Sequence, residues 1–102
     1  PNIISSTSYV SKTCKLSEAI IIMHKVIINS NVQIGENVVV NTGSIIEHDV
    51  VIGKNSHIST GVIVNGGVKI GENCFIGSGS VLRENTQISN NTFLKMGSLV
   101  KK

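Results

Sequence analysis

The sequence predicts an all-β fold, a parallel β-helix of a little under six coils, from three columns of residues that recur every six positions. One column is aliphatic, the second is small or β-branched, and the third consists of residues that favour turns. Only three of the 102 residues are aromatic and none is Trp, so a conventional globular core has little material. The repeat itself must therefore hold the fold together.

The aliphatic column has seventeen members, and all of them are Ile, Val or Leu. These three residue types make up 33 of the 102 residues, so random filling of the column has odds of about one in 10⁸. A fixed apolar position in every repeat is typical of a short strand that points one side chain inward. The members are Ile4, Val10, Leu16, Ile22, Ile28, Ile34, Val40, Ile46, Ile52, Ile58, Val64, Ile70, Ile76, Leu82, Ile88, Leu94 and Val100.

The second column lies four residues after each aliphatic member, and every residue in it is small or β-branched. It shares the inward face of the strand with the next aliphatic residue, where only compact side chains fit. Cys14 and Cys74 belong to this column. We therefore expect both to be small buried hydrophobic residues, and not a disulfide or a pair of metal ligands.

The third column lies three residues after each aliphatic member, and from Asn31 to Gly97 it contains only Asn, Asp and Gly. These residue types tolerate a positive φ, so each repeat is expected to turn at a left-handed residue. Four earlier members break the rule, which predicts less regular first coils; they are Thr7, Thr13, Ala19 and Lys25.

The turns also repeat with a longer period of 18 residues, visible in Gly43, Gly61, Gly79 and Gly97. This period predicts three strands per coil, with like turns stacked on like turns, and a prism about 27 Å long at about 4.8 Å per coil. Residues 1–102 then form a single domain. Because the chain opens at Pro1 without Met, we expect it to be the C-terminal part of something longer.

Composition excludes several function classes. The net charge of +3 comes from scattered basic residues, which does not favour nucleic acid as a partner. No apolar run approaches the roughly 20 residues of a membrane span, and no signal-peptide pattern opens the chain. The sequence therefore predicts a cytoplasmic protein without a membrane partner.

One histidine stands apart from the repeat. His48 lies two residues after Ile46, beside a turn, and is flanked by Glu47 and Asp49. A carboxylate next to an imidazole can fix its tautomer for general base catalysis. The alternative is a solvated surface histidine, and Asp49 is also explained by its turn position.

The motif of an aliphatic residue followed by Gly, with small residues in the second column, resembles the left-handed β-helix of the hexapeptide acyltransferases over essentially the whole chain. The resemblance implies the left hand, which the repeat alone does not fix. It also implies a homotrimer with active sites between neighbouring prisms. Fold alone does not establish the chemistry.

The stretch 40–53, followed by Ser56-His57-Ile58-Ser59, closely resembles the sugar O- and N-acetyltransferases of bacterial sialic acid and diamino-sugar pathways. This resemblance implies that His48 is the general base, that Asp49 supports it and that Asn41 helps to shape the site. Glu47 completes the acidic triplet around His48. Acetyl-CoA is the implied co-substrate, and no metal is needed.

The same resemblance assigns the coenzyme site. His57 is expected to contact the thioester or the pantetheine arm, and Ser78 and Met96 to line the groove on a neighbouring prism. The repeat does not require glycine at position 66, so Gly66 is expected to leave room above His48 and to offer its N–H to the developing oxyanion. Lys95, Lys101 and Lys102 are candidates for the phosphates, although a solvated basic tail is the simpler account of the last two.

The sequence thus predicts acetyl transfer to the amino group of a UDP-linked 4-amino-sugar. Two alternatives stay open: O-acetylation of a sialic acid or another sugar hydroxyl, and a trimerisation scaffold without chemistry. Zinc enzymes of the same fold are not favoured, because the three histidines lack the spacing of a zinc site. The Rossmann-like domain that holds the sugar nucleotide in this family is not in the sequence; Gly77-Ser78-Gly79 is turn chemistry, not a dinucleotide fingerprint.

Overall fold

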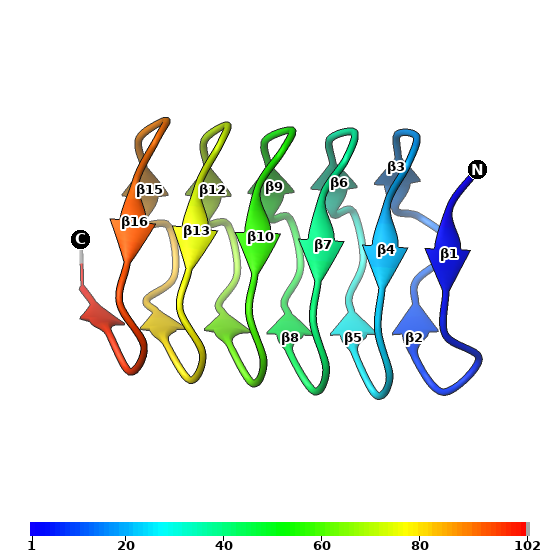
Figure 1. Cartoon of the computed structure of the whole chain (residues 1–102), viewed down its shortest axis with the longest axis horizontal. Helices are drawn as coiled ribbons and strands as arrows, with labels where there is room; N and C mark the ends of the chain where they lie inside the picture. The colour runs from blue at the N-terminus through cyan, green and yellow to red at the C-terminus, as the bar shows by residue number, and fades with distance from the viewer. Residues whose placement is uncertain (102) are drawn as a thin grey trace.

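Each hexapeptide forms one short strand and one turn, so the chain winds into a three-sided prism (Figure 1). The structure is a computed structural model and describes residues 1–101. Each strand pairs in parallel with one or both of the strands three positions away in the chain, and the fold is the predicted left-handed parallel β-helix. The longest dimension is 31 Å, close to the length expected from the coil number.

The seventeen strands form three sheets, one on each side of the prism. Sheet 1 contains β1 (Ile3–Ile4), β4 (Ile21–Ile22), β7 (Val39–Val40), β10 (His57–Ile58), β13 (Phe75–Ile76) and β16 (Phe93–Leu94). Sheet 2 contains β2 (Tyr9–Val10), β5 (Ile27–Ile28), β8 (Ile45–Ile46), β11 (Ile63–Val64), β14 (Val81–Leu82) and β17 (Leu99–Val100). Sheet 3 contains β3 (Lys15–Leu16), β6 (Gln33–Ile34), β9 (Val51–Ile52), β12 (Lys69–Ile70) and β15 (Gln87–Ile88).

The turns form three edges, named here by the sheets that they join. The 1/2 edge holds residues 41–44, 59–62 and their equivalents, the 2/3 edge holds residues 47–50, 65–68 and their equivalents, and the 3/1 edge holds residues 53–56, 71–74 and their equivalents. Residues 18 apart lie one above the other, as in the pairing of His57 with Phe75. An offset of 18 in the sequence is therefore a neighbour in space.

The core is the inside of the prism, filled by the two inward columns. Members such as Ile46, Ile76 and Val64 are fully buried. Cys74 is buried, as predicted, whereas Cys14, in the first coil, is only half-buried against the core; both are free thiols. The serines of the second column remain inside because their hydroxyls donate to backbone carbonyls, as Ser44 does to the Ser59 carbonyl at 2.7 Å.

The turn column adopts the left-handed conformation at every Asn, Asp and Gly from Asn31 to Gly97. Ala19 and Lys25 also have φ near 60°, so the prediction that they break the pattern was wrong: stacking on the next coil outweighs their own preference. Thr7 and Thr13 do differ. Their hydroxyls accept the backbone N–H groups of Lys25 and Asn31, at 3.0 and 2.9 Å, where a regular turn offers a carbonyl.

Candidate active site

His48 lies on the 2/3 edge, in the turn that follows β8. Its Nδ1 atom is 2.9 Å from Oδ2 of Asp49, and both side chains are largely exposed. When Nδ1–H donates this hydrogen bond to the carboxylate, the ring keeps the tautomer whose Nε2 carries a free lone pair. Asp49 sits at φ 60°, so one residue both makes the turn and orients the ring.

Gly66 lies one coil further along the same edge, directly over the imidazole. A Cβ added at Gly66 would lie 2.6 Å from Nε2 and 2.7 Å from Cε1 of His48. The φ of Gly66 is outside the left-handed region, in contrast to that of Gly67, so its backbone does not require glycine. The missing side chain therefore keeps the space above Nε2 open, as the sequence predicted.

The turn around His48 opens into a cleft of about 530 Å³ on the 2/3 edge. Three carboxylates line it, from Glu47, Asp49 and Glu84. Glu84 is 36 residues after His48 and belongs to the same column, with only Gly66 between them. Glu84 was not among the predicted site residues, although its offset of two full coils placed it here.

Glu47 is held by a residue that the sequence analysis missed. Its Oε1 atom accepts a hydrogen bond of 2.8 Å from Nδ2 of Asn29, one coil earlier on the same edge. The offset of 18 residues between Asn29 and Glu47 was the available signal. This bond holds the Glu47 carboxylate, and Glu47 lines the same cleft as His48.

The remaining predicted site residues lie on other sides of the prism from His48. Asn41, Ser78 and Met96 are on the 1/2 edge, and His57 is on sheet 1. The Oδ1 atom of Asn41 accepts the Thr42 backbone N–H at 2.7 Å. Since all of sheet 2 separates the two edges, His57, Ser78 and Met96 lie away from His48 within one prism, and only Gly66 of the predicted coenzyme contacts lies beside it.

His57 is half-buried, and its ring lies 5.4 Å from that of Phe75. The third histidine, His24, is on the 1/2 edge with its Nδ1 atom 2.8 Å from the Ser5 hydroxyl. Within residues 1–101 no three His, Cys, Asp or Glu side chains are grouped closely enough to hold a metal ion. Lys102, a candidate for the coenzyme phosphates, lies outside the described residues.

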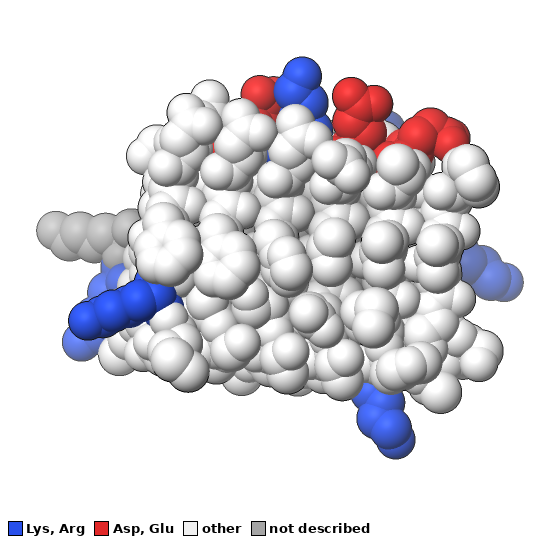
Figure 2. Space-filling model, viewed as in Figure 1, with Lys and Arg blue, Asp and Glu red and all other residues white. Residues whose placement is uncertain are grey.

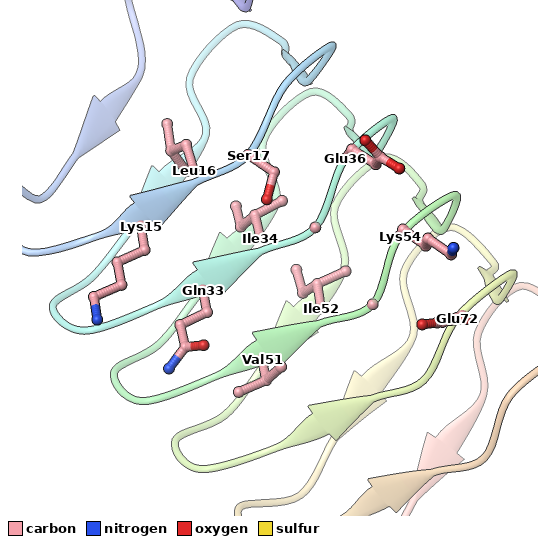
Figure 3. A pocket seen from close by; sticks show the side chains of 12 residues that line it. Lys15, Leu16, Ser17, Gln33, Ile34, Glu36, Val51, Ile52, Lys54 and Glu72 are labelled. Carbon is pink, nitrogen blue, oxygen red and sulfur yellow. The ribbon is translucent and has the colours of Figure 1, made fainter.

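A second hollow, of about 440 Å³, runs over sheet 3 and contains none of the predicted site residues (Figure 3). Its glycines, Gly35 and Gly53, are needed for coil packing, because a Cβ at either would lie 2.6 Å from the backbone of the next coil. The hollow is therefore explained by close coil stacking, and the cleft at His48 is the better candidate for chemistry.

Comparison with known families decides the identity of the fold. Residues 31–66, 49–84 and 67–102 match the family model described as bacterial transferase hexapeptide (six repeats). The chain belongs to this family. Comparison of the chain with curated protein sequences gives no significant match.

Two solved structures match the chain along 99% of its length. The acetyltransferase domain of PglB from Neisseria gonorrhoeae has a TM-score of 0.98 at 26% identity, and the chain covers 49% of it. PerB from Caulobacter crescentus, solved with CoA and GDP-perosamine, has a TM-score of 0.98 at 31% identity and is also covered to 49%. The PglB domain solved with acetyl coenzyme A has a TM-score of 0.94 at 25% identity, with 51% covered. The chain thus spans about half the length of these relatives.

The described residues contain no helix long and apolar enough to cross a membrane.

Proposed function

We propose that this solenoid is the catalytic domain of an acetyl-CoA-dependent acetyltransferase that acts on the amino group of a nucleotide-linked 4-amino-sugar. The observation that carries the proposal is the arrangement of Asp49, bonded to Nδ1 of His48, and Gly66, which lies over the ring. It presents a free imidazole nitrogen under an open space. Solved relatives with bound CoA, acetyl-CoA and GDP-perosamine support both the donor and the acceptor class.

The proton transfer and the oxyanion contact of the proposed reaction use residues of the cleft. His48 Nε2 takes a proton from the acceptor amine, and the nitrogen lone pair attacks the thioester carbonyl carbon. The tetrahedral intermediate collapses, the carbon–sulfur bond breaks, and the proton held by His48 passes to the departing CoA thiolate. Among residues 1–101 nothing accepts a hydrogen bond from the Gly66 N–H, so this donor is free to meet the carbonyl oxygen as it becomes negative.

The charge of the cleft favours an amine over a hydroxyl acceptor. Glu47, Asp49 and Glu84 line it, no Lys or Arg is among its lining residues within the described part of the chain, and Arg83 is paired with Glu84 at 3.4 Å. An amino sugar arrives largely as a cation at neutral pH, so the carboxylates attract it to the cleft, where it loses one proton to solvent before His48 takes the second during attack. A neutral hydroxyl gains nothing from the carboxylates. The hydroxyl of a sialic acid is disfavoured further, because that sugar is itself an anion.

We also propose a homotrimer, on the basis of the outward-facing side chains. On sheets 1 and 2 they are apolar except for His57, whereas on sheet 3 four of the five are Lys or Gln. All large exposed hydrophobic residues belong to sheet 1, sheet 2 or the edge between them; they are Ile3, Ile4, Tyr9, Ile27, Ile63, Phe75, Phe93, Met96 and Leu99. Figure 2, which looks onto sheet 1, shows that the middle of this face is uncharged, with acidic side chains along one edge and basic side chains at its ends and along the opposite edge. Two adjacent apolar faces fit a ring in which each prism contacts two others.

Such a ring would complete the site. Around an axis parallel to the prisms, equivalent coils lie at equal heights. His57 follows His48 by nine residues, half a coil, which is a rise of about 2.4 Å. His57 of the partner subunit would therefore lie within about half a coil of the height of His48. Ser78 and Met96 of the partner subunit would lie about one and two coils beyond that His57 along the groove.

The proposed location is the cytoplasm, where acetyl-CoA is made and where the two free thiols, Cys14 and Cys74, would stay reduced. We also propose that a separate domain holds the nucleotide of the sugar, as the family resemblance implies.

Acetyl-CoA binding by calorimetry, with the mass measured by light scattering, tests the proposal. We expect a trimer that binds acetyl-CoA, and a His48→Ala variant that keeps binding but releases no free CoA when a 4-amino-sugar nucleotide is added. A well-formed trimer that binds no acetyl-CoA would favour the scaffold alternative. Equal CoA release by His48→Ala and the wild type would remove His48 as the base.

A further inference from the structure

The 2/3 edge on the N-terminal side of His48 carries a lysine that the proposed chemistry does not use. Lys12, Ser30 and His48 occupy the same turn position in three successive coils, 18 residues apart, so they stand in one column. Lys12 and Ser30 are both exposed. Because Ser30 is small, a ligand that reaches His48 from this side can pass over it and extend to Lys12.

The donor side of the cleft decides which substrate takes this path. Gly66 opens the space over His48 one coil towards the C-terminus, and its N–H is the proposed contact of the thioester oxygen. The proposed coenzyme groove continues in the same direction, past Ser78 and Met96 of the partner subunit. The acceptor sugar is therefore expected to extend the other way, towards Lys12.

The charges along this path have the same polarity as the acceptor. Glu47 and Asp49 stand at the level of His48, whereas Lys12 is the first charged residue of the 2/3 edge on the N-terminal side. In the part of the chain that the structure describes, no carboxylate lies within ion-pair distance of Lys12. A nucleotide-linked amino sugar carries an ammonium on one side of its ring and a diphosphate on the other. Each end therefore meets an opposite charge.

The proposed trimer adds a second cation at this height. Lys25 is exposed on the 1/2 edge, which faces the 2/3 edge of a neighbour in the proposed ring. It follows Lys12 by 13 residues, a rise of about 3.5 Å. Lys25 of the partner subunit would therefore lie between the heights of Lys12 and Ser30, where the groove between the two prisms would be cationic.

The spacing along the edge fits the same ligand. Lys12 lies two coils before His48, about 10 Å. Single bonds of about 1.5 Å place the two phosphorus atoms of a diphosphate about 6–9 Å from an amine on the opposite carbon of the sugar ring. The flexible four-carbon stem of a lysine covers the difference. We propose that Lys12 binds the diphosphate of the acceptor and so selects nucleotide-linked over free amino sugars; the inference rests on the proposed function.

The diphosphate itself supplies the probe. CoA release gives kcat and KM for a UDP-linked 4-amino-sugar, and UDP, which carries the diphosphate without the sugar, serves as the competitor. We expect Lys12→Ala to raise both the KM of the acceptor and the inhibition constant of UDP about 10-fold, with kcat within about two-fold of the wild type. Added salt should narrow this difference, because the contact is exposed.

Two further variants control for charge. Lys12→Arg keeps the cation and should restore both constants to within about two-fold of the wild type. Lys15→Ala removes the same charge from the same coil but on sheet 3, where Lys15 points away from the prism (Figure 3), and should change neither constant. Light scattering checks that each variant has the mass of the wild type.

The outcomes separate this inference from the proposed function. An unchanged KM in Lys12→Ala, or equal losses in Lys12→Ala and Lys15→Ala, would overturn the inference while the proposed function stands. A raised KM with unchanged UDP inhibition would also overturn it, because Lys12 would then act on the sugar and not on the diphosphate. So would a wild type that UDP does not inhibit. A wild type that releases no CoA with the UDP-linked acceptor would overturn the proposed function as well.

Discussion

Gly66→Ala tests the most specific geometric feature of the candidate site. The added Cβ would lie 2.6 Å from Nε2 and 2.7 Å from Cε1 of His48. Ordinary van der Waals contact requires about 3.5 Å, so the imidazole must retreat by about 1 Å. The His48 side chain is exposed and can rotate, and alanine is compatible with the backbone at this position, so the fold should accept the change.

The expected cost falls on activity. A displacement of about 1 Å at a reacting group lowers the rate about 100-fold, which corresponds to about 2.7 kcal/mol of lost transition-state stabilisation. Stability should change by no more than about 0.5 kcal/mol, as for other exposed substitutions. We therefore expect kcat to fall about 100-fold with little change in the thermal midpoint.

The assay is release of free CoA thiol from acetyl-CoA in the presence of an amino-sugar nucleotide. A double-mutant cycle supplies the control: in a His48→Ala background, Gly66→Ala should have less than about a two-fold further effect, because the group that it displaces is gone. A folded Gly66→Ala variant with kcat within two-fold of the wild type would refute the placement of the reacting atoms above Nε2. A fully additive effect would show that Gly66 acts independently of His48.

Three further predictions concern orientation, backbone strain and assembly. Asp49→Asn keeps a residue that accepts φ 60° but removes the charge beside Nδ1, so CoA release should fall at least about 10-fold while the thermal midpoint stays unchanged. A lower thermal midpoint together with the slower CoA release would mean that Asp49 only makes the turn. Lys25→Gly relieves a left-handed φ of 57° and should raise the free energy of unfolding by about 0.5–1 kcal/mol in urea denaturation, and a decrease would contradict the strain. Ile27→Lys places a charge on sheet 2 and should yield monomers by light scattering, whereas Gln33→Lys on sheet 3 should stay trimeric; the reverse result would assign the interface to sheet 3.

The sequence predicted most of the fold because the repeat has few solutions. An aliphatic residue every six positions and a turn residue in step with it define strands, corners and the stacking of coils. Lys25 shows the limit of local preference: a residue that rarely adopts a positive φ does so here, because it stacks on the left-handed turn of Gly43 in the next coil. Thr13 shows the opposite case, in which a hydroxyl replaces the usual carbonyl acceptor.

The candidate site was predictable wherever it follows one edge. The offset of 18 residues placed Gly66 over His48, and the same arithmetic would have found Asn29 below Glu47. The period of 18 residues does not predict contacts between residues on different edges. His57 lies on a different side of the prism, and only a second copy of the chain can bring it to the cleft. A period within one chain carries no information about how copies pack.

The central claim is that His48 and the coenzyme contacts come from different protomers, and mixed trimers test it most directly. His48→Ala and His57→Ala are each expected to be inactive. When the two variants are unfolded together in equal amounts and refolded, a site made from two protomers should recover about a quarter of the wild-type rate of CoA release, because about one junction in four pairs an intact His48 with an intact His57 of the partner subunit. If the mixture stays inactive although mixed trimers have formed, both histidines serve the same protomer and the shared site is wrong.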